Sequence, residues 1–210
     1  MENLNFILPE IFISLSIMFL LLFGVFKKNS SKLTFNLSLF VLLITTIITF
    51  NETFSVSRMT MFNDSIVIDH MSSLMKIITL IGGFLVLVIS SSYLKVFKLF
   101  NIEYPILILT SILGMMVMIS SNDLIVFYMG LELQSLGLYV LASYNRDQLK
   151  SSEAGLKYFV LSALSSGLLL YGCSLIYGFS GSTNFDVISN QLNSSEYALT
   201  FGIVFILVGL

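Results

Sequence analysis

The sequence has almost none of the side chains that bind metals and redox groups. Its 210 residues include one cysteine, Cys173, one histidine, His70, and no tryptophan. These are too few ligands for an iron–sulfur cluster, a bis-histidine haem or a structural zinc ion. A GxGxxG or P-loop motif is also absent from the sequence. We therefore expect this chain to bind no cofactor and no metal, and His70 to be an ordinary residue at the edge of an apolar segment.

Charged residues are scarce as well. They make up 10% of the sequence, whereas hydrophobic residues make up 56% and phenylalanine alone occurs 19 times. Soluble domains carry about 25% charged residues, so this composition excludes an ordinary soluble protein. The first apolar run follows Met1-Glu2-Asn3 directly, without a basic segment. We therefore expect no cleavable signal peptide at this end.

Long apolar runs dominate the rest of the sequence. A helix needs about 20 apolar residues to cross a bilayer, and six runs approach or exceed this length: 7–26, 33–50, 71–92, 104–121, 124–144 and 154–178. Pro9 and Pro105 lie at the starts of two of them, where a helix tolerates proline. The sequence thus predicts an all-α, polytopic transmembrane bundle that forms a single membrane domain over residues 1–210.

Two stretches depart from this pattern. Residues 51–70 are too polar to span a membrane, and they form either a short hairpin or a segment at the membrane interface. Residues 197–210, YALTFGIVFILVGL, begin a seventh span but cover only about 21 Å of the roughly 30 Å hydrocarbon core. The truncated run predicts either a fragment or a protein whose remainder is a second polypeptide.

Basic residues concentrate in alternate loops. The loops after the first, third and fifth runs hold Lys27, Lys28, Lys32, Lys95, Lys98, Arg146 and Lys150. The other side has one basic loop residue, Arg58, against Glu2, Glu10, Glu52, Asp64, Asp69, Asp123, Asp186 and Glu196. Cytoplasmic loops are enriched in lysine and arginine, so this bias predicts that the amino terminus lies outside.

Two charges lie within apolar runs. Glu132 lies in the fifth run and Lys157 in the sixth, although a charge at mid-membrane depth costs roughly 2.5–3.5 kcal/mol. On a helix, Glu132 shares a polar face with Tyr128, Ser135, Tyr139 and Ser143, whereas Gly130, Gln134 and Gly137 lie on the far side and allow close helix packing. In the sixth run, the face opposite Lys157 holds Gly155, Ser162, Ser166 and Cys173.

These charges have two interpretations. One is a structural Glu132–Lys157 salt bridge, and the other is a proton relay in which Glu132 sets the proton affinity of Lys157, directly or through water. Glu153 precedes Lys157 by four residues, so it is either a carboxylate at a helix start or a relay member. We expect Lys76 to be an anchor that extends to the membrane surface, and Glu10 to be interfacial.

The stretch YMGLELQSLGLYVLASYNRDQLKSSEAGLKYFVLSALSSGLLLYGCSLIYGFSGSTNF, residues 128–185, resembles the family of chain 2 of NADH–ubiquinone oxidoreductase, or respiratory complex I, whose bacterial counterpart is the N subunit. The first hundred residues match mainly in the spacing of their spans. The resemblance implies an antiporter-like fold of about fourteen helices in two inverted repeats, of which this chain is the amino-terminal half. The family's buried glutamate falls on Glu132, its sixth-helix lysine on Lys157, and the preceding acidic residue on Glu153.

The resemblance implies a proton-translocating subunit of NADH:ubiquinone reductase in the respiratory electron-transport chain, with no redox chemistry in this chain. Its implied partners are other membrane-arm subunits of complex I, a second polypeptide and the lipid bilayer, and no nucleic acid. Abundant Phe, Ile, Asn and Ser suggest an AT-rich genome, so we expect the mitochondrial inner membrane, with a bacterial plasma membrane as the alternative. A subunit of a multisubunit Na⁺/H⁺ antiporter and a non-pumping scaffold remain competing functions.

Overall fold

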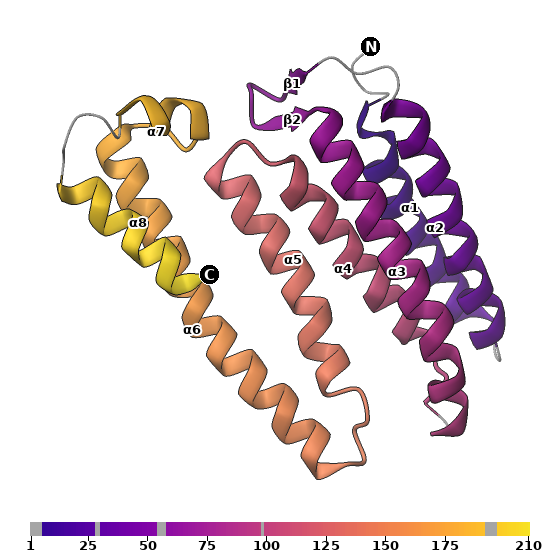
Figure 1. The fold of residues 1–210 in the computed structure, drawn as a ribbon. Helices are drawn as coiled ribbons and strands as arrows, with labels where there is room; N and C mark the ends of the chain where they lie inside the picture. The colour runs from indigo at the N-terminus through magenta and orange to yellow at the C-terminus, as the bar shows by residue number, and fades with distance from the viewer. Residues whose placement is uncertain (1–5, 28–29, 54–57, 98, 192–196) are drawn as a thin grey trace.

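Six long helices dominate the computed structural model, which describes residues 6–27, 30–53, 58–97, 99–191 and 197–210 (Figure 1). All six are long and apolar enough to cross a membrane, which confirms the predicted spans. In chain order they are α1 (Leu8–Phe26), α2 (Ser31–Thr53), α3 (His70–Val96), α4 (Glu103–Ser120), α5 (Leu124–Ala142) and α6 (Leu149–Ser180).

Polar side chains define where two of these helices begin. The Asp69 carboxylate accepts a hydrogen bond of 2.7 Å from the backbone N–H of Ser72, and Ser72 Oγ accepts one of 2.9 Å from the N–H of Asp69. This reciprocal capping box satisfies two N–H groups that the first turn of α3 leaves unpaired. At the start of α5, Asp123 accepts a bond of 2.8 Å from the N–H of Ile125.

The polar segment before α3 contains the short hairpin that was one of its two predicted forms. Strand β1 (Met59–Met61) pairs antiparallel with β2 (Ile66–Ile68). The backbone N–H of Asn122 donates to Ser65 O at 2.8 Å, and its side-chain amide donates to Asp64 O at 3.0 Å. These bonds attach the hairpin to the α4–α5 connection. Residues 54–57, which also belong to this segment, lie outside the described residues.

Two shorter helices follow α6. Helix α7 (Phe185–Gln191) was not anticipated from the sequence, whereas α8 (Tyr197–Gly209) is the truncated apolar run. Helix α8 packs antiparallel on α6 (Figure 1), and a Cβ atom added to Gly172 would lie 2.8 Å from Gly202 O. Such close backbone contact is typical of membrane helices that pack through small residues.

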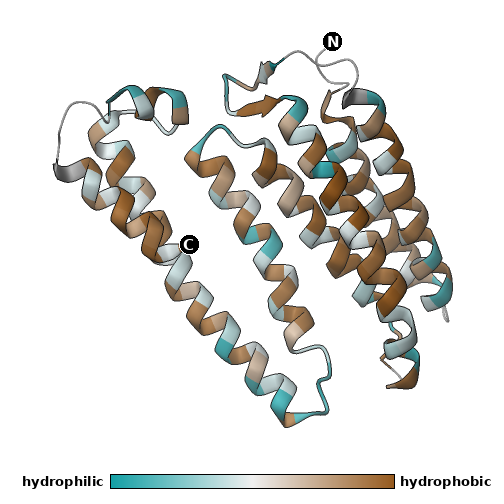
Figure 2. Cartoon of the chain, in the orientation of Figure 1, coloured by the Kyte–Doolittle hydropathy of each residue, from teal (hydrophilic) through white to brown (hydrophobic). Residues whose placement is uncertain are grey.

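The buried core has two parts. The larger lies among α1, α2, α3 and α4 and contains Ile13, Leu20, Phe35, Leu42, Leu80, Leu87, Leu94, Ile106, Leu109, Ile112 and Met116. The smaller joins α6 to the start of α5, to α7 and to α8, through Leu124, Leu169, Cys173, Ile176, Ile188 and Leu199. Residues along the middle of the helices are largely hydrophobic (Figure 2). Many of these hydrophobic side chains are exposed, as expected for a surface in contact with lipid.

Helices α4 and α5 connect the two parts through glycine. A Cβ atom added to Gly114 would lie 2.5 Å from Gln134 N and 2.8 Å from Gly130 O. One added to Gly137 would lie 3.1 Å from Leu107 O. The two backbones therefore touch along the face of α5 that the sequence predicted for close packing.

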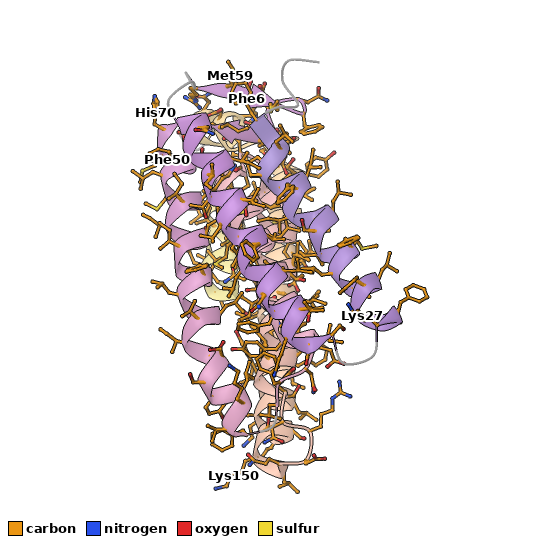
Figure 3. The ribbon with its side chains drawn as sticks, turned by 90° about the vertical axis from the view of Figure 1, so that its right-hand side faces the viewer. Phe6, Lys27, Phe50, Met59, His70 and Lys150 are labelled. Carbon is orange, nitrogen blue, oxygen red and sulfur yellow. The ribbon has the colours of Figure 1, made fainter. Side chains whose placement is uncertain are left out.

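The helix ends separate the loop charges. We call the end with the hairpin and α7 the acidic end, and the opposite end the basic end. Figure 3 shows Met59 and His70 at the acidic end, and Lys27 and Lys150 at the basic end. Lys32 follows Lys27 at the start of α2, Arg146 lies in the connection before Lys150, and Lys95 lies in the last turn of α3, which ends at the same side of the bundle. Exposed His70 begins α3. Other members of the loop-charge pattern (Glu2, Lys28, Glu52, Lys98 and Glu196) lie outside the described residues or side chains.

Candidate functional site

Glu132 lies near the middle of α5, and its atom Oε1 is buried without a hydrogen-bond partner among the described residues. On the same helix, Ser135 Oγ donates a hydrogen bond of 3.0 Å to the Glu132 carbonyl oxygen, so it leaves this carboxyl atom unsatisfied. Nearly all buried polar atoms in folded proteins have a hydrogen-bond partner, so an unpartnered buried oxygen marks a place where a water or another group can bind. Glu132 is therefore suited to hold a proton or to bind water.

Hydroxyl groups surround this part of α5. The Tyr139 hydroxyl is hydrogen-bonded to Ser162 Oγ across the α5–α6 interface. The Tyr139 ring meets the Tyr158 ring edge to face, with their centroids 4.9 Å apart. The face predicted to be polar is thus bound to α6 by groups that both donate and accept protons in hydrogen bonds.

A cavity of about 310 Å³ opens beside these hydroxyls, between α5, α6 and the end of α8. Its polar lining consists of Gln134, Ser135, Tyr158, Ser162, Ser165 and Ser166. A cavity of this size with several hydrogen-bonding groups suits water, which needs two to four polar partners. It lies one helical turn from Glu132, because Ser135 is three residues along α5.

Lys157 pairs with Glu153 on its own helix. Its Nζ atom lies 2.6 Å from Glu153 Oε1, and the two side chains are 67% and 53% exposed. A direct Glu132–Lys157 ion pair, one of the forms that the sequence left open, is not among the ion pairs of the described residues. The helix backbone places residues four apart side by side, so Glu153 reaches Lys157 without any contact between helices. A connection through water between Glu132 and Lys157 stays a prediction.

The most buried ion pair among the described residues was not predicted from the sequence. Lys76 Nζ of α3 lies 2.5 Å from Glu10 Oε1 of α1, and their side chains are 3% and 12% exposed. The second carboxylate oxygen, Glu10 Oε2, is buried without a hydrogen-bond partner among the described residues. The expectation of an outward-reaching Lys76 anchor was therefore wrong, whereas Glu10 lies in the first turn of α1 and its depth relative to the membrane surface stays a prediction.

A sequence signal for this pair existed. The buried positions of α3 include Ser72, Ser73, Leu80, Gly83 and Leu87, which together with Lys76 recur at spacings of three and four residues. Such a periodic stripe marks the face that packs against other helices. Lys76 lies in this stripe, so its side chain points into the bundle.

Comparison with known proteins identifies this architecture. Residues 121–210 match the transmembrane family described as NADH:quinone oxidoreductase/Mrp antiporter. The NADH-quinone oxidoreductase subunit N of Pelagibacter ubique is 73% identical over 210 residues, which is all of this chain and 44% of that protein. The chain belongs to the antiporter-like family of NADH-quinone oxidoreductase membrane subunits. The match confirms the resemblance that residues 128–185 carry.

Other relatives agree with this assignment. Subunit N of Bartonella bacilliformis is 51% identical, over 99% of this chain and 43% of that protein. This chain therefore spans less than half the length of the relatives it matches.

Solved structures show the same fold. A chain of respiratory complex I from Thermus thermophilus superimposes with a TM-score of 0.78 at 23% identity, over 96% of this chain and 42% of that one. A chain of an archaeal membrane-bound sulfane sulfur reductase gives 0.81 at 22%, over 97% and 43%. A chain of the Mrp complex of Dietzia gives 0.77 at 20%, over 98% and 40%.

Proposed function

We propose that this chain carries protons as part of a membrane subunit of an NADH:quinone oxidoreductase, in which proton translocation is coupled to quinone reduction. The observation that carries the proposal is the buried carboxyl atom of Glu132, which has no hydrogen-bond partner among the described residues and lies one turn from a hydroxyl-lined cavity. Family membership supports it, since the 73% identical relative is a subunit N. The chain itself performs no redox step in this proposal.

Glu132 would be the proton-holding group of α5. Its unpartnered oxygen is available to exchange a proton with a water in the neighbouring cavity, one turn away. Ser135 and Ser162, which line the cavity, can orient such a water because each hydroxyl both donates and accepts. Small changes in the hydration or packing of this site would therefore load or release a proton.

Lys157 and Glu153 would form the next station. Their 2.6 Å contact joins a group that donates protons in hydrogen bonds to a carboxylate that accepts them. The proton would then pass between Lys157 and Glu132 through water and the hydroxyls of α5 and α6, and not through a direct ion pair.

The proposed setting is the plasma membrane of a bacterium, with the amino terminus outside. The reported relatives are bacterial, which favours this membrane over the mitochondrial inner membrane that base composition suggested. The separation of basic and acidic ends supports the orientation. Other membrane-arm subunits are the expected partners, since the structural neighbours include chains of multisubunit respiratory complexes.

Two competing functions predict different outcomes. The family description also covers Mrp antiporters, and the Mrp complex of Dietzia shares the fold. An antiporter subunit would purify without NADH dehydrogenase activity. If the subunit were a non-pumping scaffold, the loss of Glu132 would leave proton pumping unchanged, or the complex would fail to assemble.

The test is Glu132→Gln in the native complex. Proton pumping per NADH oxidised should fall while the complex still assembles, because glutamine preserves packing but cannot carry the proton. The fall should be partial, since parallel routes through other subunits would continue. The matched control is Glu103→Gln, which changes an exposed glutamate at the basic end. Full pumping by both Glu132→Gln and Lys157→Ala would show that these residues are structural.

A further inference from the structure

The proton route uses α5 and α6, but a second polar feature lies between α2 and α3. A groove of about 730 Å³ runs along the basic-end halves of these helices. Its lining comprises Lys32, Phe35, Asn36 and Leu39 of α2, Val88, Ser91 and Lys95 of α3, and Phe100 of the following loop.

The two walls of the groove change in the same order with depth. From the basic end, α2 presents Lys32, then Asn36, then Leu39, and α3 presents Lys95, then Ser91, then Val88. On each helix the steps are four and three residues, which keeps the three side chains on one face. Since the helices are antiparallel, both walls change from cationic to polar to apolar over about 10 Å of helix axis.

Aromatic rings support the cationic level of the groove. Lys95 Nζ lies 5.9 Å from the centroid of the Phe100 ring, and this ring lies 5.2 Å from that of Phe35. Both lysines are exposed, and neither forms an ion pair within the part of the chain that the structure describes. The residues that line the groove include no aspartate or glutamate. The two cations are therefore open to an external anion.

We propose that this groove binds an acidic glycerophospholipid of the basic-end leaflet. The phosphate would lie between Lys32 and Lys95, as basic pockets between membrane helices bind anionic headgroups. One turn deeper, the Asn36 amide would donate hydrogen bonds to the ester carbonyls, and the small Ser91 leaves room for them.

The apolar level continues the match to a lipid. The acyl chains would follow Leu39 and Val88 toward the membrane centre, where outward-facing Phe40, Leu43 and Leu85 extend the apolar surface. A free phosphate ion would contact only the two lysines, and the polar and apolar parts of the groove would then have no ligand. The site needs only that the helices cross a bilayer, so it is independent of the proton route through Glu132.

The test labels the groove in the full chain, which is purified from its membrane together with any subunits that remain bound to it. The preparation is reconstituted in phosphatidylcholine vesicles with increasing phosphatidylglycerol, a trace of which carries a photoactivatable group near the glycerol. Peptide mapping after illumination should find label between residues 32 and 39 and between 88 and 100. Lys32→Gln and Lys95→Gln should each raise the phosphatidylglycerol fraction for half-maximal labelling about five-fold.

Controls separate this site from general surface attraction. The pair Lys27→Gln/Lys150→Gln removes two exposed charges from the same end but outside the groove, and should leave labelling unchanged. If it weakens labelling as much as the groove variants do, the groove has no specific role. Equal labelling by a phosphatidylcholine probe, or no label in these peptides, would overturn the proposal. Displacement by inorganic phosphate at matched ionic strength would show that the groove binds a soluble anion instead.

Discussion

Lys76 Nζ and Glu10 Oε1 lie 2.5 Å apart between α3 and α1, and both side chains are almost completely buried. Removing one member of a buried pair leaves an uncompensated charge and costs about 3–5 kcal/mol. We therefore expect Lys76→Met to lower the free energy of unfolding by this amount. Thermal unfolding of the purified protein in detergent measures the effect, with exposed Lys150→Met as the control.

Replacing both Glu10 and Lys76 should lower the stability of the protein far less than replacing Lys76 alone. Glu10→Leu together with Lys76→Met leaves no unpaired charge, and an apolar pair of similar volume is often neutral or stabilising. The double variant should therefore unfold at a higher temperature than Lys76→Met alone. If the single variant is as stable as the parent, the pair contributes no net stability and Lys76 has another role.

Loss of the Lys157–Glu153 pair should affect proton pumping more than stability. Because both side chains are exposed in this chain, at 67% and 53%, the pair should contribute less than about 1 kcal/mol to stability. Lys157→Ala should therefore leave the unfolding temperature nearly unchanged while it lowers proton pumping. The exposed Arg146–Glu103 pair, at 3.3 Å, supplies a control, since Arg146→Ala should change neither quantity strongly. Loss of folding in Lys157→Ala alone would contradict this view.

Asp69 should make the stability of α3 sensitive to pH. The hydrogen bond from the Ser72 backbone N–H, above all, holds the pKa of this carboxyl below its ordinary value of 3.8. A lowered pKa in the folded state means that the carboxylate stabilises the fold above pH 3.8. This contribution is lost as the pH falls from 3.8 through the lower, folded-state pKa.

Asp69→Asn tests this dependence because asparagine also caps helices well. The variant should keep most of the stability at neutral pH but lose part of the acid sensitivity of the unfolding temperature. Asp69→Ala should cost about 0.5–2 kcal/mol at neutral pH. Asp64→Asn, in the exposed hairpin turn, serves as the control. Identical pH profiles for the parent and Asp69→Asn would exclude a role for this carboxylate.

The α4–α5 contact should not accept larger side chains. A Cβ atom added to Gly130 would lie 2.8 Å from Met118 N and 3.0 Å from Gly114 O, and these backbone atoms cannot move aside cheaply. We expect Gly130→Ala to cost about 1–3 kcal/mol through overpacking. Gly82→Ala on α3 is the matched control because nothing lies within 4 Å of its added Cβ atom. Equal unfolding temperatures for the two variants would contradict the close contact.

Much of the architecture was predictable because it depends on local pattern. The six spans follow from the length of the apolar runs, and the hairpin follows from the polar break between two of them. The packing face of α5 followed from its helical periodicity, which placed Gly130 and Gly137 on one side. The buried position of Glu132 was also visible, since its neighbours along the chain are apolar.

The partners of the charged residues were decided only by the tertiary structure. Lys157 has two acids within possible reach, and the backbone of α6 places Glu153 beside it, whereas a pair with Glu132 depends on the distance between helices. Glu10 and Lys76 lie far apart in the chain, so their contact arises only when α1, α3 and α4 pack together. Hydropathy determines which segments enter the membrane, but the packing of helices within the bundle decides which buried charge finds a partner and which, like Glu132 Oε1 within the described residues, does not.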